Sequence, residues 1–277
     1  MASSPAAASA RPPVLELRKV SKTFVNPDGK AFQAIRDVDL RVADLPGAGE
    51  FRVILGPSGC GKSTILNIVA GLFAPTSGVA LLRGQPITGP GPDRGMVFQS
   101  YSSYPWLTIL DNVAFGLKLR GVPRDERERT ARAWIKKVGL EGTERKYPGQ
   151  LSGGMRQRVA IARTLAVKPQ IILMDEPFGA LDVQTRLGMQ NLINQLWEEL
   201  DATILFVTHD IAEAVYLADT IYILSAGPGT LVDEIPIDLP LHRTEDLKNT
   251  ARFRELETLV LDKIREEASG GNVRLTT

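Results

Sequence analysis

The sequence has one cysteine, almost no net charge and no long apolar run, and each of these features excludes a class of protein. With a single cysteine in 277 residues, no disulfide forms within the chain and a reducing compartment is expected. The formal net charge of +1 provides no overall basic field, so no nucleic-acid partner is expected. No run approaches the roughly 18 continuous apolar residues of a membrane helix. We therefore expect a globular protein that does not enter a membrane by itself but can dock on a membrane protein.

The N-terminal residues 1–13 lack the apolar centre of a signal peptide. They are rich in alanine, serine and proline, and we expect them to form a disordered tail. The remaining chain is long enough for one large domain or two modest ones with a sizeable core.

The most informative segment is the glycine-rich motif GPSGCGKST at residues 56–64. The apolar run at residues 50–55 predicts a buried strand before it, and helically spaced apolar residues predict a helix after it that ends near Gly71. These apolar residues are Ile65, Ile68, Val69 and Leu72. Such a turn cradles phosphates, because its glycines let backbone N–H groups approach closely and the helix N-terminus adds about half a positive charge. The residues expected to bind a nucleotide are Gly56, Pro57, Ser58, Gly59, Cys60, Gly61, Lys62, Ser63 and Thr64.

Two side chains of this motif have distinct expected roles. Lys62 would reach the β- and γ-phosphates, and the Ser63 hydroxyl would hold Mg²⁺. Cys60 is expected to be a tolerated small side chain rather than a catalytic thiol. The alternative of an ordinary flexible glycine turn is disfavoured by the flanking strand and helix. The motif indicates a nucleoside triphosphate but not a function, since kinases, switches, motors and transport ATPases share it.

Strands and helices alternate along the rest of the chain, which indicates an α/β fold. Strands are expected at residues 15–24, 34–42, 77–84, 96–99, 171–174 and 204–207. Helices are expected at residues 110–119, 124–138 and 253–266, with a crossover helix carrying Leu192, Ile193, Leu196, Trp197 and Leu200.

Polar side chains follow several of the expected strands. Asp175 and Glu176 come after one apolar run, His209 after another, and Gln99 ends a third. Because ligands bind at the carboxyl ends of parallel strands, we expect these side chains at one edge with the glycine-rich motif. Neighbours on a strand point in opposite directions, so Asp175 would take the Mg²⁺ while Glu176 polarises the water that attacks the γ-phosphate.

Three other residues have interpretations that the local sequence leaves open. His209 would contact the γ-phosphate or the attacking water, although an isolated histidine is more often structural. Gln99 can coordinate Mg²⁺ and orient water, and a purely structural role fits its position equally well. Phe24 ends its strand where an aromatic ring could stack on a purine, and a core aromatic is an equal alternative.

The segment LSGGMRQR at residues 151–158 is not explained by a single active site. Ser152, Gly153 and Gly154 are typical of a helix start, with a hydroxyl cap, exposed N–H groups and a positive dipole end. This would be a second anion-binding device, and an ordinary capped helix remains the alternative.

Taken in order, GPSGCGKST, Gln99, LSGGMRQR, IILMDEP, GALD and VTHD resemble the ATP-binding subunit of ABC transporters. The resemblance covers nearly all of residues 14–235. It implies an α/β P-loop NTPase (RecA-like) ABC ATPase core with an inserted helical subdomain and an antiparallel β subdomain. The implied domains are the tail at 1–13, the ATP-binding domain at 14–238 with its helical subdomain at about 100–165, and a C-terminal extension with one helix at 239–277.

The same resemblance implies roles for individual residues and a dimer. Two copies would pair head to tail, with each ATP between Lys62 of one copy and the LSGG segment of the other. A groove beside Gln99 would receive a helix of a membrane subunit. The remaining roles are adenine stacking for Phe24, the catalytic base for Glu176, the switch histidine for His209, and communication across the dimer for Asp182.

A closer resemblance is to importer subunits for nitrate, sulfonates and taurine, carried by PWLTILDNVAFGL, MDEPFGALD and PIDLPLHR. It implies an ATP-hydrolysing subunit that uses ATP and Mg²⁺, forms a homodimer and lies peripherally at the cytoplasmic face of the cell membrane. Its partners would be permease subunits and, indirectly, a solute-binding protein. The alternatives are an importer ATPase for another solute class, a soluble ABC ATPase that acts on nucleic acid or ribosomes, and a non-hydrolysing regulatory module. The chain has one cassette, no coiled-coil insertion, and both Glu176 and His209, which disfavours the last two.

Overall fold

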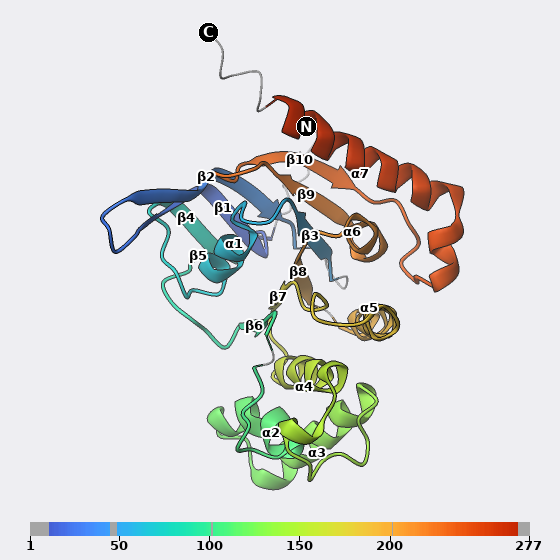
Figure 1. The fold of residues 1–277 in the computed structure, drawn as a ribbon. Helices are drawn as coiled ribbons and strands as arrows, with labels where there is room; N and C mark the ends of the chain where they lie inside the picture. Colours follow the sequence, from blue (N-terminus) through green and yellow to red (C-terminus); the bar gives the residue numbers. More distant parts are fainter. Residues whose placement is uncertain (1–10, 45–48, 101, 201, 271–277) are drawn as a thin grey trace, which may run out of the picture.

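The computed structural model describes residues 11–44, 49–100, 102–200 and 202–270, and they are arranged around two β-sheets (Figure 1). The larger sheet has six strands in the order β10-β9-β3-β8-β7-β6. Its neighbouring strands are parallel except for β10 and β9, which are antiparallel. The strands are β3 (Phe51–Leu55), β6 (Arg94–Val97), β7 (Ile171–Asp175), β8 (Thr203–Thr208), β9 (Thr220–Leu224) and β10 (Leu231–Pro236).

The smaller sheet is antiparallel and has the order β2-β1-β4-β5. Its strands are β1 (Leu15–Val25), β2 (Ala31–Val42), β4 (Ser77–Leu82) and β5 (Gln85–Pro86). A parallel sheet with crossover helices and a separate antiparallel sheet are the two β components that the expected fold class requires.

The large sheet is buried on both faces, and its central strands are mostly apolar: every residue of β3 and β8 is buried, as are the first four residues of β7. On β7, Ile171 and Leu173 pack into a core with the small sheet and the helix α1 (Lys62–Val69). The alternate residues Ile172 and Met174 pack into a second core with the helices of the opposite face. The sheet therefore separates two cores.

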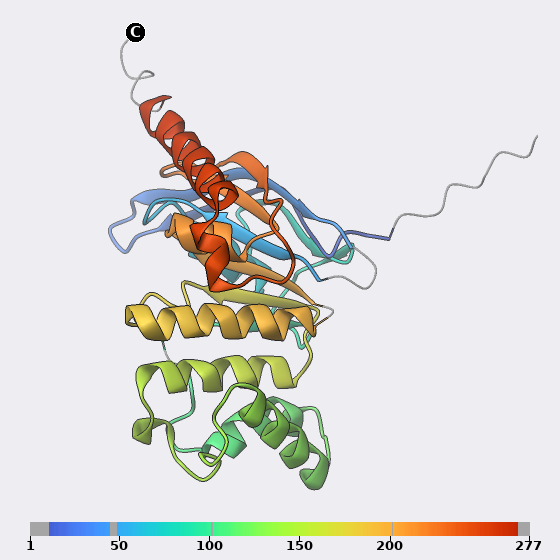
Figure 2. The ribbon, with the colours of Figure 1, turned by 90° about the vertical axis from the view of Figure 1, so that its right-hand side faces the viewer.

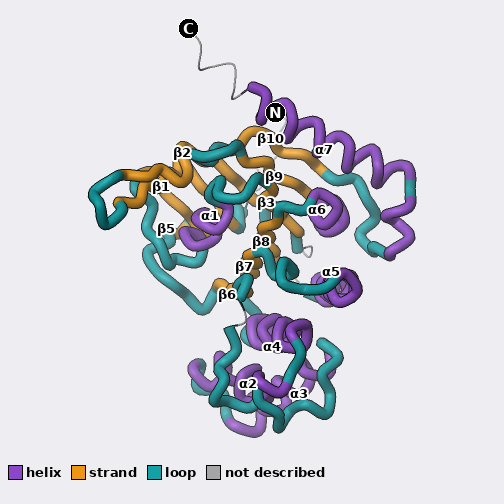
Figure 3. Tube along the Cα trace, viewed as in Figure 1, coloured by secondary structure: helices purple, strands orange, loops and turns teal. Residues whose placement is uncertain are grey.

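On that opposite face α4 packs against β6, and α5 lies alongside α4 (Figure 2). Two further helices, α2 and α3, pack against α4 at the end of the molecule away from α7 (Figures 1 and 3). The bounds are α2 (Ile109–Leu119), α3 (Arg124–Lys137), α4 (Gly153–Ala166), α5 (Val183–Glu198), α6 (Ile211–Leu217) and α7 (Ala251–Gly270), with short 3₁₀ helices η1 (Pro148–Gln150) and η2 (Glu245–Asn249). No helix in the described ranges has the length and apolar character needed to span a bilayer.

Three expectations about element bounds require correction. The strand expected at 96–99 is β6, which ends at Val97, so Gln99 lies beyond it. Leu72 lies beyond α1 and is 47% exposed, because Gly71 has a φ of +79° and ends the helical path. Leu200 follows α5 rather than belonging to it. Most of the expected tail, residues 1–10, lies outside the described residues.

Candidate functional site

The glycine-rich motif connects β3 to α1 and forms a tight loop. Gly61 precedes the first helical residue with a φ of +99°, a conformation that favours glycine. A Cβ at Gly61 would also collide with Ile35 and with the Ala34 carbonyl. The loop therefore packs directly on β2, and a glycine is required at this close approach.

A cleft of about 390 Å³ lies over this loop. Besides the loop, the small sheet, the segment after β6 and the residue after β7 contribute to its wall. The lining residues are Phe24, Phe32, Ala34, Ser58, Gly59, Gly61, Lys62, Ser63, Thr64, Gln99 and Glu176. Gly56, Pro57 and Cys60 are not among them; Cys60 is buried, and burial raises the pKa of its thiol.

Lys62 is held within the loop and its side chain is only 5% exposed. Its Nζ donates hydrogen bonds to the carbonyl oxygens of Gly56 at 2.8 Å and Pro57 at 3.0 Å. The same ammonium lies 3.7 Å from Oε1 of Glu176. A positive charge is thus fixed at the floor of the cleft, where a phosphate could displace these carbonyl partners.

Ser63 and Asp175 lie together beside Lys62. The Ser63 hydroxyl donates to Oδ1 of Asp175 at 2.9 Å. Burial raises the pKa of Asp175, and the hydrogen bond from Ser63 opposes part of that rise. With the Gln99 amide in the same cleft, the oxygen donors are of the hard type that Mg²⁺ prefers. In the described part of the chain no group of three or more His, Cys, Asp or Glu side chains could hold a metal. Mg²⁺ commonly takes one or two protein carboxylates and completes its coordination with water and substrate phosphates, so this small set of protein oxygens fits it.

Glu176 lies between Lys62 and His209. Its Oε2 is 3.1 Å from Nδ1 of His209, and its backbone N–H donates to the Val207 carbonyl at 3.1 Å. Its φ is +40°, which is uncommon for a residue with a side chain. Asp175 and Glu176 do reach different partners, but the reason is this turn of the backbone rather than simple alternation along a strand.

Phe24 and Phe32 form the aromatic end of the cleft. They are paired across β1 and β2 and both line the wall. The Phe24 ring also packs edge-on against Phe73, with centroids 5.5 Å apart. Phe24 is therefore not enclosed in either core, which is the arrangement that a stacking role requires.

Ser152 and Asp182 each cap a helix away from this cleft. The Ser152 hydroxyl accepts from the N–H of Met155 at 3.3 Å at the start of α4. Asp182 begins α5 and accepts from both the N–H and the hydroxyl of Thr185, which lower the pKa of Asp182. Among the described residues, those that line the cleft include neither Asp182 nor Ser152, Gly153 and Gly154.

Comparison with known proteins places this site in a family. A family model described as ABC transporter matches residues 39–179. The chain belongs to the ABC transporter family. The chain is 47% identical, over 91% of its length and 92% of the relative, to an uncharacterised ABC transporter ATP-binding protein of Methanocaldococcus jannaschii. The nitrate import ATP-binding protein of Synechocystis is 46% identical over 86% and 90% of the two chains. The taurine import ATP-binding protein of Escherichia coli is 43% identical over 90% and 97%.

A solved structure matches the fold of this ABC protein. It covers 82% of this chain and 100% of its own, with a TM-score of 0.70 and 35% identity. That structure is a dimeric ATP-binding cassette in a post-hydrolysis state bound to ADP and Pi. These comparisons confirm three predictions: the resemblance to ABC transporters, including nitrate and taurine importers; the α/β P-loop fold class; and the ATPase class.

The sequence of this ABC protein did not identify every residue near the site. Phe32 was missed, although its place opposite Phe24 across the turn at 26–30 is a usable signal. Arg186 and Glu213 were also missed; they line a smaller pocket of about 50 Å³ together with His209 and Glu176. They come from two different helices, and their meeting depends on tertiary packing.

Proposed function

We propose that this chain is the ATP-hydrolysing subunit of an ABC importer for a small anion such as nitrate, a sulfonate or taurine. The observation that carries the proposal is the position of Glu176, with a lysine ammonium 3.7 Å away on one side and a histidine 3.1 Å away on the other. The solute class is supported by relatives whose names specify nitrate import and taurine import.

The chemistry follows from the residues of the cleft. The loop N–H groups and Lys62 bind the phosphates, while Phe24 stacks on the adenine. Ser63, Asp175 and Gln99 would hold Mg²⁺, which neutralises phosphate charge when bound. Glu176 accepts a proton from the attacking water, and a positioned base of this kind contributes about 10²–10⁴-fold in rate. His209 orients Glu176 and the γ-phosphate, since phosphoryl transfer depends mainly on positioning and electrostatics.

The site is completed by a second copy of the chain. The helix start at Ser152, Gly153 and Gly154 is suited to an anion but is absent from the described wall of its own cleft. In a head-to-tail homodimer this helix start would face the ATP held by Lys62 of the partner, and Asp182 would lie where the two copies communicate. The similar cassette solved as a dimer supports this arrangement.

The same proposal includes the domain boundaries of the chain and its location in the cell. Residues 14–238 form the ATP-binding domain, with a helical subdomain at about 100–165 that docks on permease subunits, and residues 239–277 form an extension. The assembly lies peripherally at the cytoplasmic face of the membrane and receives solute indirectly through a solute-binding protein.

Two assays test the proposal. Purified protein should hydrolyse ATP only with Mg²⁺, and a Glu176→Gln variant should lose turnover while it still binds ATP. Proteoliposomes with the cognate permease and binding protein should then take up radiolabelled nitrate, an alkanesulfonate or taurine in an ATP-dependent manner. Metal-independent hydrolysis would contradict the site, and ATP-dependent uptake of none of these three solutes would contradict the solute class.

A further inference from the structure

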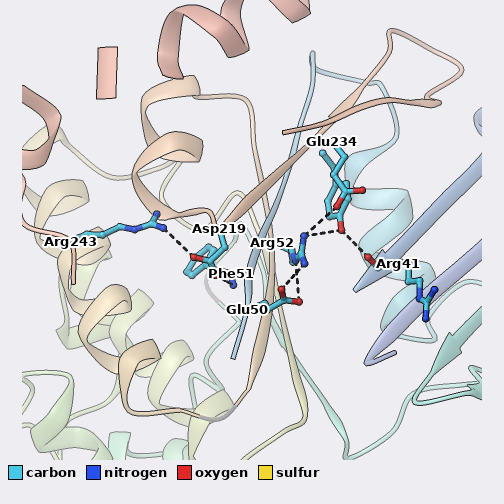
Figure 4. A network of polar contacts seen from close by, with 8 residues as sticks. Arg41, Glu50, Phe51, Arg52, Asp219, Glu234 and Arg243 are labelled. Atoms are coloured by element: carbon cyan, nitrogen blue, oxygen red, sulfur yellow. Dashed lines mark hydrogen bonds and ion pairs between the residues drawn. The ribbon is translucent and has the colours of Figure 1, made fainter. Parts of the chain in front are cut away.

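Residues 239–250, which precede α7, lie against α5 and α6. The polar network in Figure 4 shows one of its anchors, Arg243, pointing at Asp219. Arg243 is buried and donates to the carbonyl oxygens of Tyr216 and Ala218, both at 2.8 Å, and to Oδ1 of Asp219 at 3.2 Å. The other oxygen of Asp219 accepts from the N–H of Phe51 at 2.8 Å. The C-terminal end of α6 is therefore fixed both to this segment and to the central strand β3.

A second anchor of the same segment is Lys248 in η2. Its Nζ donates to Oε1 of Gln190 at 2.9 Å and lies 4.1 Å from the centre of the Tyr216 ring. Nε2 of Gln190 in turn donates to Oε1 of Glu213 at 3.1 Å. Gln190 and Glu213 are 4% and 5% exposed. Since an ammonium can only donate and the Glu213 carboxylate only accepts, this chain of bonds holds the Gln190 amide in one orientation.

The chain of bonds reaches the residues on both sides of His209. Glu213 is in the first turn of α6, and its N–H donates to Oδ1 of Asp210 at 3.0 Å. The N–H of Asp210 donates to the Thr208 hydroxyl at 3.0 Å. Glu213, Asp210 and Thr208 line the small pocket that also contains His209 and Glu176.

Residues 239–250 thus hold the C-terminal end of α6 directly, through Arg243, and its first turn indirectly, through Gln190 of α5. His209 lies two residues before the start of α6. Burial raises the pKa of Glu213, and hydrogen bonds from the side chains of Thr208 and Gln190 oppose part of that rise. A buried carboxyl with specific donors occupies a defined position, and any change in its donors alters the turn that carries His209.

We propose that Lys248 is a positioning residue for ATP hydrolysis, which acts through Gln190 and Glu213 to hold His209 against Glu176. The inference rests on the proposed function, because it concerns turnover at that site. The C-terminal extension then has a role: residues 239–250 set the position of His209. Nucleotide binding depends on the glycine-rich loop instead.

The test substitutes Lys248→Met, which removes the donor and the charge but keeps a long side chain over Tyr216. The kcat for ATP hydrolysis should fall about twofold to thirtyfold, the range seen for residues along a coupling network, while KM for ATP changes less than about twofold. Amide hydrogen exchange in residues 208–217 should become faster, and exchange in α1 should not change. Lys248→Arg should restore turnover. The matched control is Lys263→Met in α7. It removes a lysine that forms ion pairs with Asp233 and Glu266, away from α5 and α6, and it should leave kcat unchanged.

A second variant breaks the chain at its middle. Gln190→Glu keeps an acceptor for Lys248 but cannot donate to Glu213, so kcat should fall as it does for Lys248→Met. Wild-type kcat in both variants would overturn the inference, and so would a lower kcat with unchanged exchange at 208–217 or an equal loss of nucleotide affinity. Absence of hydrolysis in the wild-type protein would instead refute the proposed function, which keeps the two failures distinct.

Discussion

At the scale of single residues, the site is a set of polar side chains that are held by one another and by the backbone of the glycine-rich loop. Lys62 is bonded to two carbonyl groups and faces Glu176, which in turn faces His209. Each of these groups has a partner that a nucleotide or a water molecule can replace. These polar groups are therefore ordered before a substrate arrives, which is the condition for electrostatic preorganisation.

Lys62→Ala should weaken ATP binding. A hydrogen bond to a charged group contributes roughly 1.5–3 kcal/mol, so affinity should fall about 10-fold to 150-fold. Titration with a fluorescent ATP analogue measures the change, and Lys263→Ala is the control for loss of an exposed charge. An unchanged affinity would count against the assignment of the loop to phosphates.

Glu213→Gln should change how stability depends on pH. Burial raises the pKa of Glu213 above its ordinary value of 4.5, so ionisation costs more in the folded chain than in the unfolded chain. Below pH 4.5 the carboxyl is neutral in both states and this cost is absent; as pH rises through the folded pKa, stability is lost. The difference in melting temperature, variant minus wild type, should therefore increase from pH 4 to pH 7. If this difference in melting temperature stays constant or decreases with pH, burial does not raise the pKa of Glu213 in the folded protein.

At the scale of elements, the end of α1 shows how one residue directs the chain. Gly71 has a φ of +79°, and a Cβ there would collide with the backbone of Gly89 and Pro90. The helix α1 ends just before Gly71, where the chain runs against the backbone of Gly89 and Pro90. Both the conformation and the lack of space require glycine.

Gly71→Ala should destabilise the protein more than Gly29→Ala. Both glycines have a positive φ, +79° and +81°, so both substitutions lose about 1–2 kcal/mol from the left-handed conformation. Nothing lies within 4 Å of a Cβ at Gly29, which makes it a matched control for the collision at Gly71. Urea denaturation should give a larger loss of unfolding free energy for Gly71→Ala, and equal losses would mean that the close approach to Gly89 is not rigid.

The elements that the sequence predicted best are those whose burial is decided locally. Strands β7 and β8 contain the continuous apolar runs 171–174 and 204–207, as expected where both faces of the sheet are covered. Such a run can be recognised in the sequence without knowledge of the tertiary structure. The glycine-rich loop is equally local. The predicted end of β6, at Gln99, was wrong by two residues, because the strand ends at Val97. The apolar Phe98 continues the hydrophobic pattern after strand pairing has stopped.

The parts that could not be predicted depend on contacts between distant segments. Glu213 joins the surroundings of His209 only because α5 places Gln190 against it. Lys248 and Arg243 are ordinary cations in a polar stretch, and no periodicity indicates that they are fixed on α5 and α6. Sequence reasoning locates the motif residues, while the residues that hold them require the assembled fold.

At the scale of the whole molecule, the cleft lies at the edge of the large sheet, between the glycine-rich loop and the small sheet. The described wall of the cleft contains the loop, the aromatic pair and Glu176 but not the helix start at Ser152. Under the proposed function, one chain would hold ATP on one side only, and a second copy would close the other side.

The most direct measurement of this claim is sedimentation of the Glu176→Gln variant with and without MgATP. Since this variant should bind ATP without hydrolysing it, the account predicts a monomer without nucleotide and a stable dimer at saturating ATP. The double variant Glu176→Gln with Lys62→Ala should stay monomeric, because without Lys62 the glycine-rich loop binds ATP too weakly. A Glu176→Gln protein that binds ATP yet remains monomeric at saturation would contradict the shared reaction centre.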